Sequence, residues 1–175
     1  MNYCSEKAAT IDHHILHSID CNFRRIRWGD VDLRRELYAC SSTQTRARVV
    51  YSAEVDGRKF TLAIYHGGEA EKQWKQDVEQ DMDIRHENIL QLYGIVQHRN
   101  IYAMLFHGDF IPFENFLETY EHCPITICYI YAYANLDFQS ALNYLYTNFR
   151  YQGILQYRML IRCSTGQFCL DLGDA

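Results

Sequence analysis

The stretch Ile84–Val96, IRHENILQLYGIV, decides the fold that the sequence predicts. Its polar turn, Arg85–Asn88, stands between two segments of different periodicity. Apolar residues recur at helical spacing in Glu69–Ile84, which predicts a helix, whereas Ile89–Val96 is rich in β-forming residues and predicts a strand. We therefore expect a helix that leads through a polar turn into a strand of a sheet.

Turn residues and alternating apolar residues predict the other strands. Asp56-Gly57 lies between the two β-rich runs of Arg48–Tyr65, a pattern typical of a tight hairpin. A strand is also expected to begin at Val31–Leu33, another at Ile101–Phe106, and a last hairpin is expected at Met159–Leu172. The strands therefore stand on both sides of the predicted helix.

Two helices are expected in the second half of the chain, at Phe113–Glu121 and Ile125–Phe149. The longer helix has two apolar stripes, Tyr133-Leu136-Ser140-Tyr144 and Ala134-Phe138-Ala141-Leu145. A helix that is apolar on two sides is typical of a core, so we expect it to lie centrally, with its Tyr hydroxyls at the rim. The mixture of helices and strands predicts an α+β fold.

Composition limits the class of protein. The chain has 175 residues, 48% of them hydrophobic, and a net charge of −5, which is typical of one globular domain and not of a nucleic-acid-binding protein. No apolar run reaches the length of about 18 residues that a membrane span needs, and the first residues lack the layout of a signal peptide, so we expect a cytoplasmic protein without a membrane partner. The seven Cys form no CxxC pair, and His13 and His17 lack a third ligand, so no metal site is expected.

From about Ile26 to Gly173 the order of elements and several short motifs resemble a eukaryotic protein kinase, and in particular the degenerate kinase-like chains of mushroom-forming fungi. The motifs are VYSA at 50–53, LAIY at 62–65, IRHENILQLYG at 84–94 and STGQFCLDLG at 164–173. The resemblance implies an N-terminal lobe with an antiparallel sheet of about five strands plus one helix, a hinge, and a partial helical C-terminal lobe. It divides the chain into an extension at 1–22, the N-terminal lobe at 23–106, and the hinge with a truncated C-terminal lobe at 107–175.

The resemblance also implies a nucleotide cleft, and this chain departs from the family at its main positions. Tyr65 stands where the family has a phosphate-binding Lys, and Asp77 stands where the family has the Glu that pairs with it. A phenol is neutral, so the two can share a hydrogen bond but no ion pair. Met104 is at the gatekeeper position and Asp171 at the Asp of D-F-G. These four are the degenerate cofactor-binding positions that we expect.

Other parts of the phosphoryl-transfer chemistry are missing from the sequence. The segment Ala39–Arg48 stands where the family has a Gly-rich loop, and it has no Gly. The chain has no Asp or Glu from Phe138 through Leu170, where the family has its catalytic base, and Arg158 stands near the place of a metal-binding Asn. We therefore expect no catalytic residue and no cofactor, with ATP and Mg²⁺ as doubtful ligands.

These departures predict a catalytically inactive protein-kinase-like module, a pseudokinase, that serves as a protein-interaction or scaffolding domain. The resemblance also implies that part of Ile125–Phe149 is exposed unless a protein partner covers it. Three alternatives stay open. The first is an ATP-binding protein with residual or atypical phosphotransfer, in which Asp171 binds metal and Arg46 or Arg48 binds phosphate. The second is an incomplete kinase-derived gene product without function of its own. The third is an unrelated enzyme that uses Cys123 or Cys128 with a His as its nucleophile pair.

Overall fold

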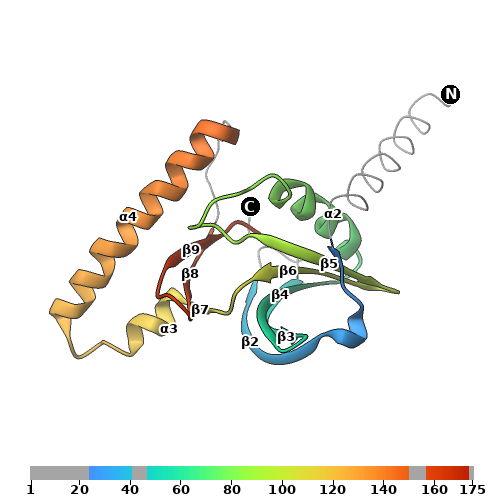
Figure 1. Cartoon of the computed structure of the whole chain (residues 1–175), viewed down its shortest axis with the longest axis horizontal. Helices are drawn as coiled ribbons and strands as arrows, with labels where there is room; N and C mark the ends of the chain where they lie inside the picture. The colour runs from blue at the N-terminus through green and yellow to red at the C-terminus, as the bar shows by residue number, and fades with distance from the viewer. Residues whose placement is uncertain (1–23, 41–46, 150–156, 174–175) are drawn as a thin grey trace.

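The computed structural model describes residues 24–40, 47–149 and 157–173, and Figure 1 shows their arrangement. The described elements are β1 (Arg24–Arg25), a 3₁₀ turn (Trp28–Asp30), β2 (Asp32–Cys40), β3 (Ala47–Val55), β4 (Arg58–His66), α2 (Ala70–Asp81), β5 (Leu92–His98), β6 (Ile101–His107), β7 (Phe110–Pro112), α3 (Phe113–Glu118), α4 (Pro124–Phe149), β8 (Arg158–Arg162) and β9 (Phe168–Asp171). The predicted extension at 1–22, the pair His13 and His17, and Arg46 lie outside these residues.

The larger sheet has six strands in the order β1-β5-β6-β4-β3-β2. Strands β2 to β6 pair antiparallel, as the sequence predicts, and β1 adds a two-residue parallel partner to β5 that the prediction lacked. The chain is therefore a mixed α+β protein, and its larger sheet is mixed because of β1.

The hairpin of β3 and β4 turns at Asp56-Gly57, as predicted. Both residues have positive φ, 51° and 71°, which is the geometry of a tight two-residue hairpin turn. Successive side chains of a strand point to opposite faces of the sheet. One face of this hairpin therefore buries Ala53, Val55, Phe60, Leu62 and Ile64, and the opposite face buries Val50, Ala63 and Tyr65.

Helix α2 packs against the second of these faces through Trp74. Its side chain is fully buried, and its indole Nε1 donates a hydrogen bond of 3.1 Å to the backbone carbonyl of Ala103 in β6. Val78 lies one turn further on and is also fully buried. The helix ends at Asp81, three residues before the predicted end at Ile84.

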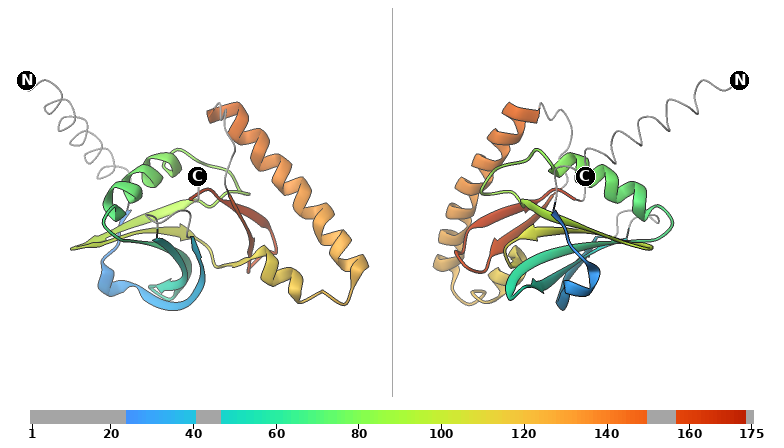
Figure 2. Two further views of the ribbon diagram at one scale, coloured as in Figure 1. Left: turned by 180° about the vertical axis from the view of Figure 1, so that it is seen from behind. Right: turned by 45° about the vertical axis from the view of Figure 1, so that its right-hand side comes forward.

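The smaller sheet has the order β7-β8-β9, and α3 and α4 pack beside it. Figure 2 shows the two sheets as separate layers with α4 along the outer side of the smaller one. Phe113, Ala141, Leu145, Phe168 and Leu170 are buried together between this sheet and the helices. The final hairpin is the one predicted over Met159–Leu172.

The stretch quoted at the outset joins the two layers. The backbone of Leu90 donates to the carbonyl of Leu170, and the backbone of Leu170 donates to the carbonyl of Asn88, both at 2.9 Å. The side-chain amide of Asn88 also donates to the carbonyl of Phe168 at 3.0 Å. At the other end of the turn, the backbone N–H of Arg85 donates to the Tyr144 hydroxyl of α4 at 2.9 Å. These bonds set the position of β9 relative to the larger sheet.

The prediction that α4 lies centrally in the core is wrong. Its stripe of Ala134, Ala141 and Leu145 is buried, whereas the Leu136 side chain is 66% exposed. The Tyr side chains expected in the core are mostly exposed as well: Tyr129, Tyr131, Tyr133 and Tyr146. The reason is that α4 lies at the edge of the fold and packs on one side only among the described residues, as Figures 1 and 2 show. The expectation of partial exposure is confirmed.

Candidate functional site

Three of the four predicted cleft positions meet on one face of the larger sheet. The Tyr65 hydroxyl of β4 lies 2.7 Å from Oδ2 of Asp77 on α2 and 3.1 Å from Sδ of Met104 on β6. All three side chains are buried. A phenol has one proton, so Tyr65 donates it over the shorter distance, to Asp77. The hydrogen bond that the sequence predicts between these two residues is present.

The fourth position, Asp171, enters this cluster from the smaller sheet through Arg48. Its Oδ2 accepts from Nη1 of Arg48 at 2.6 Å and its Oδ1 accepts from Nη2 at 3.0 Å. Two parallel charge-assisted bonds of this kind are the strongest form of an Arg–carboxylate pair. The side chains are 3% and 2% exposed, so the pair is buried between the two sheets.

The register of the larger sheet explains why Arg48 lies beside Tyr65. Arg48 on β3 is the direct cross-strand partner of Tyr65 on β4, so both side chains project from the same face. The guanidinium carbon lies 6.0 Å from the centre of the Tyr65 ring and 5.9 Å from that of Phe106. The cluster of Arg48, Asp171, Tyr38, Tyr65 and Asp77 is called the cleft cluster below.

Asp171 has no free lone pair within the cleft cluster. Besides the two bonds from Arg48, its Oδ2 accepts from the Tyr38 hydroxyl at 2.5 Å and its Oδ1 accepts from the backbone N–H of Gly173 at 3.1 Å. A carboxylate offers about four lone-pair sites, and these four donors occupy them. A metal ion therefore has to displace Arg48 or Tyr38 before it can bind this carboxylate.

The charges of the pair hold each other ionised. Burial by itself raises the pKa of Asp171, but the Arg48 cation and its hydrogen bonds outweigh burial and hold that pKa below its usual value. Burial likewise acts to lower the pKa of Arg48, but the charges of Asp171, Tyr65 and Tyr38 together with the hydrogen bonds to Asp171 outweigh it and raise that pKa. The pair is therefore ionised near neutral pH.

Asp81 adds a third carboxyl group beside the pair. It lies on α2, one turn beyond Asp77, and is 5% exposed. Burial raises its pKa well above the ordinary value, and the negative charges of Asp171 and Asp77 add to this against the opposing effect of Arg48. Among the described buried side chains there are thus three carboxyls and one guanidinium, with Asp171 and Arg48 held ionised and Asp81 shifted toward its neutral form. This is an unfavourable surrounding for a polyphosphate anion.

The Arg48 guanidinium packs directly against the backbone of Gly173. A methyl group placed on Gly173 would lie 2.4 Å from the guanidinium carbon of Arg48, so the backbone and the side chain are in direct contact. A separate hollow of about 250 Å³ lies between β2 and β7, with Leu37 and Ile111 in its lining. Ligand pockets usually measure about 300–1,000 Å³, so this hollow is small for a nucleotide.

The side chains of residues 24–40, 47–149 and 157–173 do not fit ATP with Mg²⁺. The side chains that the resemblance assigns to phosphate and metal, Tyr65 and Asp171, are neutral or fully bonded within the protein. Asp137, the last carboxylate before the stretch without acids, accepts from the backbone N–H of Phe168 at 3.1 Å. Arg158 lies over the Tyr38 ring, 4.6 Å from its centre. No group of three His, Cys, Asp or Glu that could hold a metal occurs in the described ranges.

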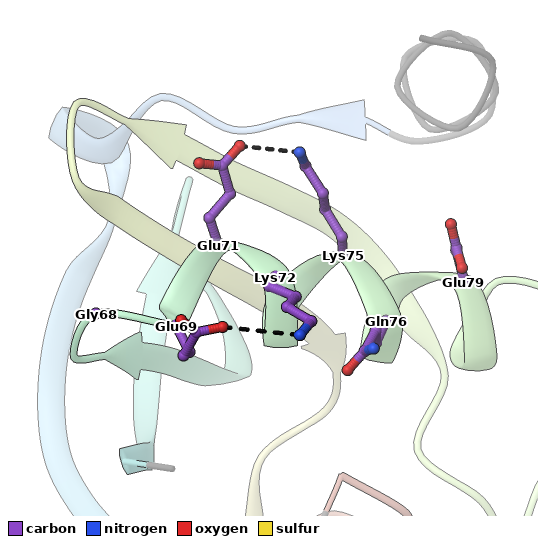
Figure 3. Close-up of a pocket in the computed structure, with 7 residues that line it drawn as sticks. All are labelled: Gly68, Glu69, Glu71, Lys72, Lys75, Gln76 and Glu79. Carbon is purple, nitrogen blue, oxygen red and sulfur yellow. Dashed lines mark ion pairs between the residues drawn. The ribbon is translucent and has the colours of Figure 1, made fainter. Parts of the chain in front are cut away.

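The described lysines lie away from Asp77. Lys59 is 3.7 Å from Asp109 at the opposite end of the hairpin, as its spacing from Tyr65 predicts. Lys75 pairs with Glu71 at 3.0 Å on the outer face of α2. That face bounds a hollow of about 690 Å³, lined by Gly68 and polar side chains of residues 69–79, and Figure 3 shows two ion pairs within its lining. Four of its five charged side chains pair with one another, and the fifth, Glu79, is acidic like two of those four, so we assign the hollow no ligand.

Among the described cysteines, Cys123 and Cys128 are exposed, and the hydrogen bond to the Thr126 hydroxyl lowers the pKa of the Cys123 thiol. The Cys123 sulfur contacts the Thr126 hydroxyl at 3.0 Å, and the neighbouring His122 pairs with Glu121. Burial raises the pKa of the Cys169 thiol to about 11, so this thiol stays protonated at neutral pH.

Sequence reasoning missed the pairing of Arg48 with Asp171 and the part that Tyr38 plays in it. One signal was available for Arg48. It stands two residues before Val50, so strand alternation places it on the same inward face. In comparisons with known proteins, no family model matches the sequence, and no curated protein matches it.

Proposed function

We propose that this chain is a catalytically inactive protein-kinase-like module, a pseudokinase, and that its role is binding another protein. The cleft between the two sheets corresponds, under this proposal, to the nucleotide cleft of the kinase fold. The larger sheet with α2 then corresponds to the N-terminal lobe, and α3, α4 and the smaller sheet to the hinge and the first part of the C-terminal lobe.

A single observation carries the proposal: the cleft is closed by its own ion pair. Arg48 takes the place that a phosphate would need and binds the carboxylate that a metal would need. Tyr65 supplies a hydrogen bond to Asp77 where catalysis needs a cation. Phosphoryl transfer depends on positioned electrostatics, and these side chains satisfy one another instead.

Nucleotide binding is the direct test. The chain is heated with and without ATP, in the presence of Mg²⁺ or of EDTA, and its unfolding temperature is followed. We expect no change with ATP under either condition, because binding stabilises a protein only where the folded state has a site. An active protein kinase serves as the positive control. A Mg²⁺-dependent rise in the unfolding temperature contradicts the proposal.

Residual phosphotransfer is the competing function, and Asp171 separates the two. Transfer of labelled phosphate from ATP is measured for the wild type, Asp171→Ala and Asp109→Ala. Asp109 lies outside the cleft cluster and pairs with Lys59, so it is a matched Asp→Ala control. We expect no transfer by any of the three. Transfer by the wild type and Asp109→Ala but not by Asp171→Ala supports the competing function.

A further inference from the structure

The side of α4 that faces away from the sheets has an uncharged row of exposed residues. They are Ile125, Tyr129, Ala132, Leu136, Gln139, Asn143 and Tyr146, and all seven are exposed. Their spacing alternates between four and three residues, which is the 3.5-residue repeat by which two helices pack along a seam. These seven residues are called the outer seam.

The outer seam lies opposite the buried stripe of the helix. Each seam residue from Tyr129 to Tyr146 stands about two positions beyond a buried or half-buried residue of the inward stripe, such as Ala134 before Leu136. Two positions on an α-helix correspond to about 200° of rotation. Figures 1 and 2 agree with this geometry, since α4 stands at the edge of the molecule with one long side turned away from both sheets.

Charge selects the kind of partner. The whole of α4 contains one charged residue, Asp137, and its carboxylate is used in accepting from the backbone of Phe168. An acidic or basic partner finds no complementary charge on the outer seam. A second copy of the same seam meets no like charge, so self-association carries no electrostatic penalty there.

The exposed area is sufficient for a small stable dimer. The side chains of Ile125, Tyr129, Tyr133, Leu136 and Tyr146, which form or flank the seam, are 85%, 62%, 57%, 66% and 54% exposed. At about 200 Å² for a whole large side chain, they present roughly 600 Å² per copy. A symmetric pair then buries about 1,200 Å², the lower end of the range for specific interfaces.

We propose that the chain forms a homodimer in which the outer seam of α4 packs against the same seam of a second copy. This names the partner of the proposed protein-binding module, and it rests on that proposed function. Homodimers are most often two-fold symmetric, and Leu136 stands near the middle of the seam. It therefore lies close to its own equivalent whichever way the two helices run. In a parallel pair Gln139 and Asn143 face their own equivalents, and in an antiparallel pair Asn143 faces Tyr129, so their polar groups set the register by hydrogen bonds across the seam.

The test uses the full chain and charges at the centre of the seam. Sedimentation velocity at micromolar concentration is expected to give twice the mass of the chain for the wild type. Leu136→Glu and Leu136→Lys each place like charges across the axis, and each is expected to weaken self-association by at least about 100-fold. An equimolar mixture of the two variants is expected to restore a dimer, because opposite charges then face each other.

Leu33 on β2 offers a matched control, because it is also an exposed leucine and lies away from α4. Leu33→Glu is expected to leave the dimer intact. Far-UV circular dichroism checks that each variant is folded, and Tyr129→Glu replaces Leu136→Glu if the latter unfolds. Two results overturn the proposal: a wild type that is monomeric at about 100 µM, and a dimer that persists in both seam variants. We set the limit at about 100 µM because pairs that need a higher concentration are transient. If the wild type is monomeric and ATP does not raise its unfolding temperature, the homodimer proposal fails while the proposal of an inactive cleft is retained.

Discussion

Arg48 and Asp171 stand 123 positions apart in the chain, and their side chains form a two-bonded, buried ion pair between the two sheets. The pair links the start of β3 to the end of β9. The Tyr38 hydroxyl and the Gly173 backbone supply the other bonds to the same carboxylate. Arg48 is the only buried arginine among the described residues, and its guanidinium is used in holding the two sheets together. The stability of the fold and the lack of a free cation beside Tyr65 therefore depend on the same residues.

Removing one partner of the pair is expected to cost more than half of what removing both costs. Asp171→Ala leaves the Arg48 cation buried without its counter-charge, which costs about 3–5 kcal/mol of unfolding free energy. The double variant Arg48→Met, Asp171→Leu removes both charges and the Arg48 Nε, a buried donor without a hydrogen-bond partner, but it also takes the Asp171 acceptor from Tyr38 and Gly173, so we expect its loss to be smaller than the sum of the two single losses. Urea unfolding of the two singles and the double measures this. Additive losses contradict it.

The hydrogen bond from Tyr65 to Asp77 is expected to contribute more than a surface bond of the same type. Tyr65→Phe removes a donor from the buried Asp77 carboxyl, which keeps a bond of 2.6 Å from Gln73, and we expect a loss of about 1–3 kcal/mol. Tyr102→Phe is the control, since Tyr102 is the cross-strand neighbour of Tyr65 and donates at an exposed site to Glu71. We expect it to cost under about 1 kcal/mol. Equal losses in urea unfolding count against the prediction.

Gly173 is expected to tolerate no side chain. Gly173→Ala places a methyl group 2.4 Å from the Arg48 guanidinium carbon, which forces the ion pair to shift and costs about 1–3 kcal/mol. Gly68→Ala is a matched control because a methyl group there meets nothing within 4 Å. Thermal unfolding of both variants, measured side by side, checks this. A Gly173→Ala variant as stable as Gly68→Ala would falsify the contact.

The carboxyl of Asp81 is expected to lower stability as the pH rises. In the folded state its pKa is raised by burial and by the charges of Asp171 and Asp77. The neutral acid therefore stabilises the folded protein fully below the pKa of about 3.9 that Asp has in the unfolded chain, and this stabilisation is lost as the pH rises through the higher folded pKa. Asp171 has the opposite sign: its folded pKa is lowered, so its stabilisation is lost as pH falls through that pKa. Asp81→Asn cannot ionise. We therefore expect it to gain stability relative to the wild type between pH 4 and pH 7 in urea unfolding, and an unchanged difference contradicts this.

Several elements could be predicted from the sequence because their signals are local. Asp56-Gly57 marks its hairpin by two residues that accept positive φ, and the spacing of Trp74 and Val78 marks the buried side of α2. The bond from Tyr65 to Asp77 could also be predicted, because it follows from the resemblance together with the chemistry of the two side chains. The two-residue strand β1 could not, because its pairing with β5 comes from chain geometry and not from residue pattern.

The amino-acid sequence by itself determined most of the segments that become helices and strands, though not β1 or β7, and that no acidic residue stands between Phe138 and Leu170. Only the tertiary structure decided that Arg48 binds Asp171, since the two lie on different sheets and meet through long-range packing. It also decided which of the two apolar stripes of α4 is buried. Both stripes are equally suited to a core, and burial depends on which side the rest of the chain packs against.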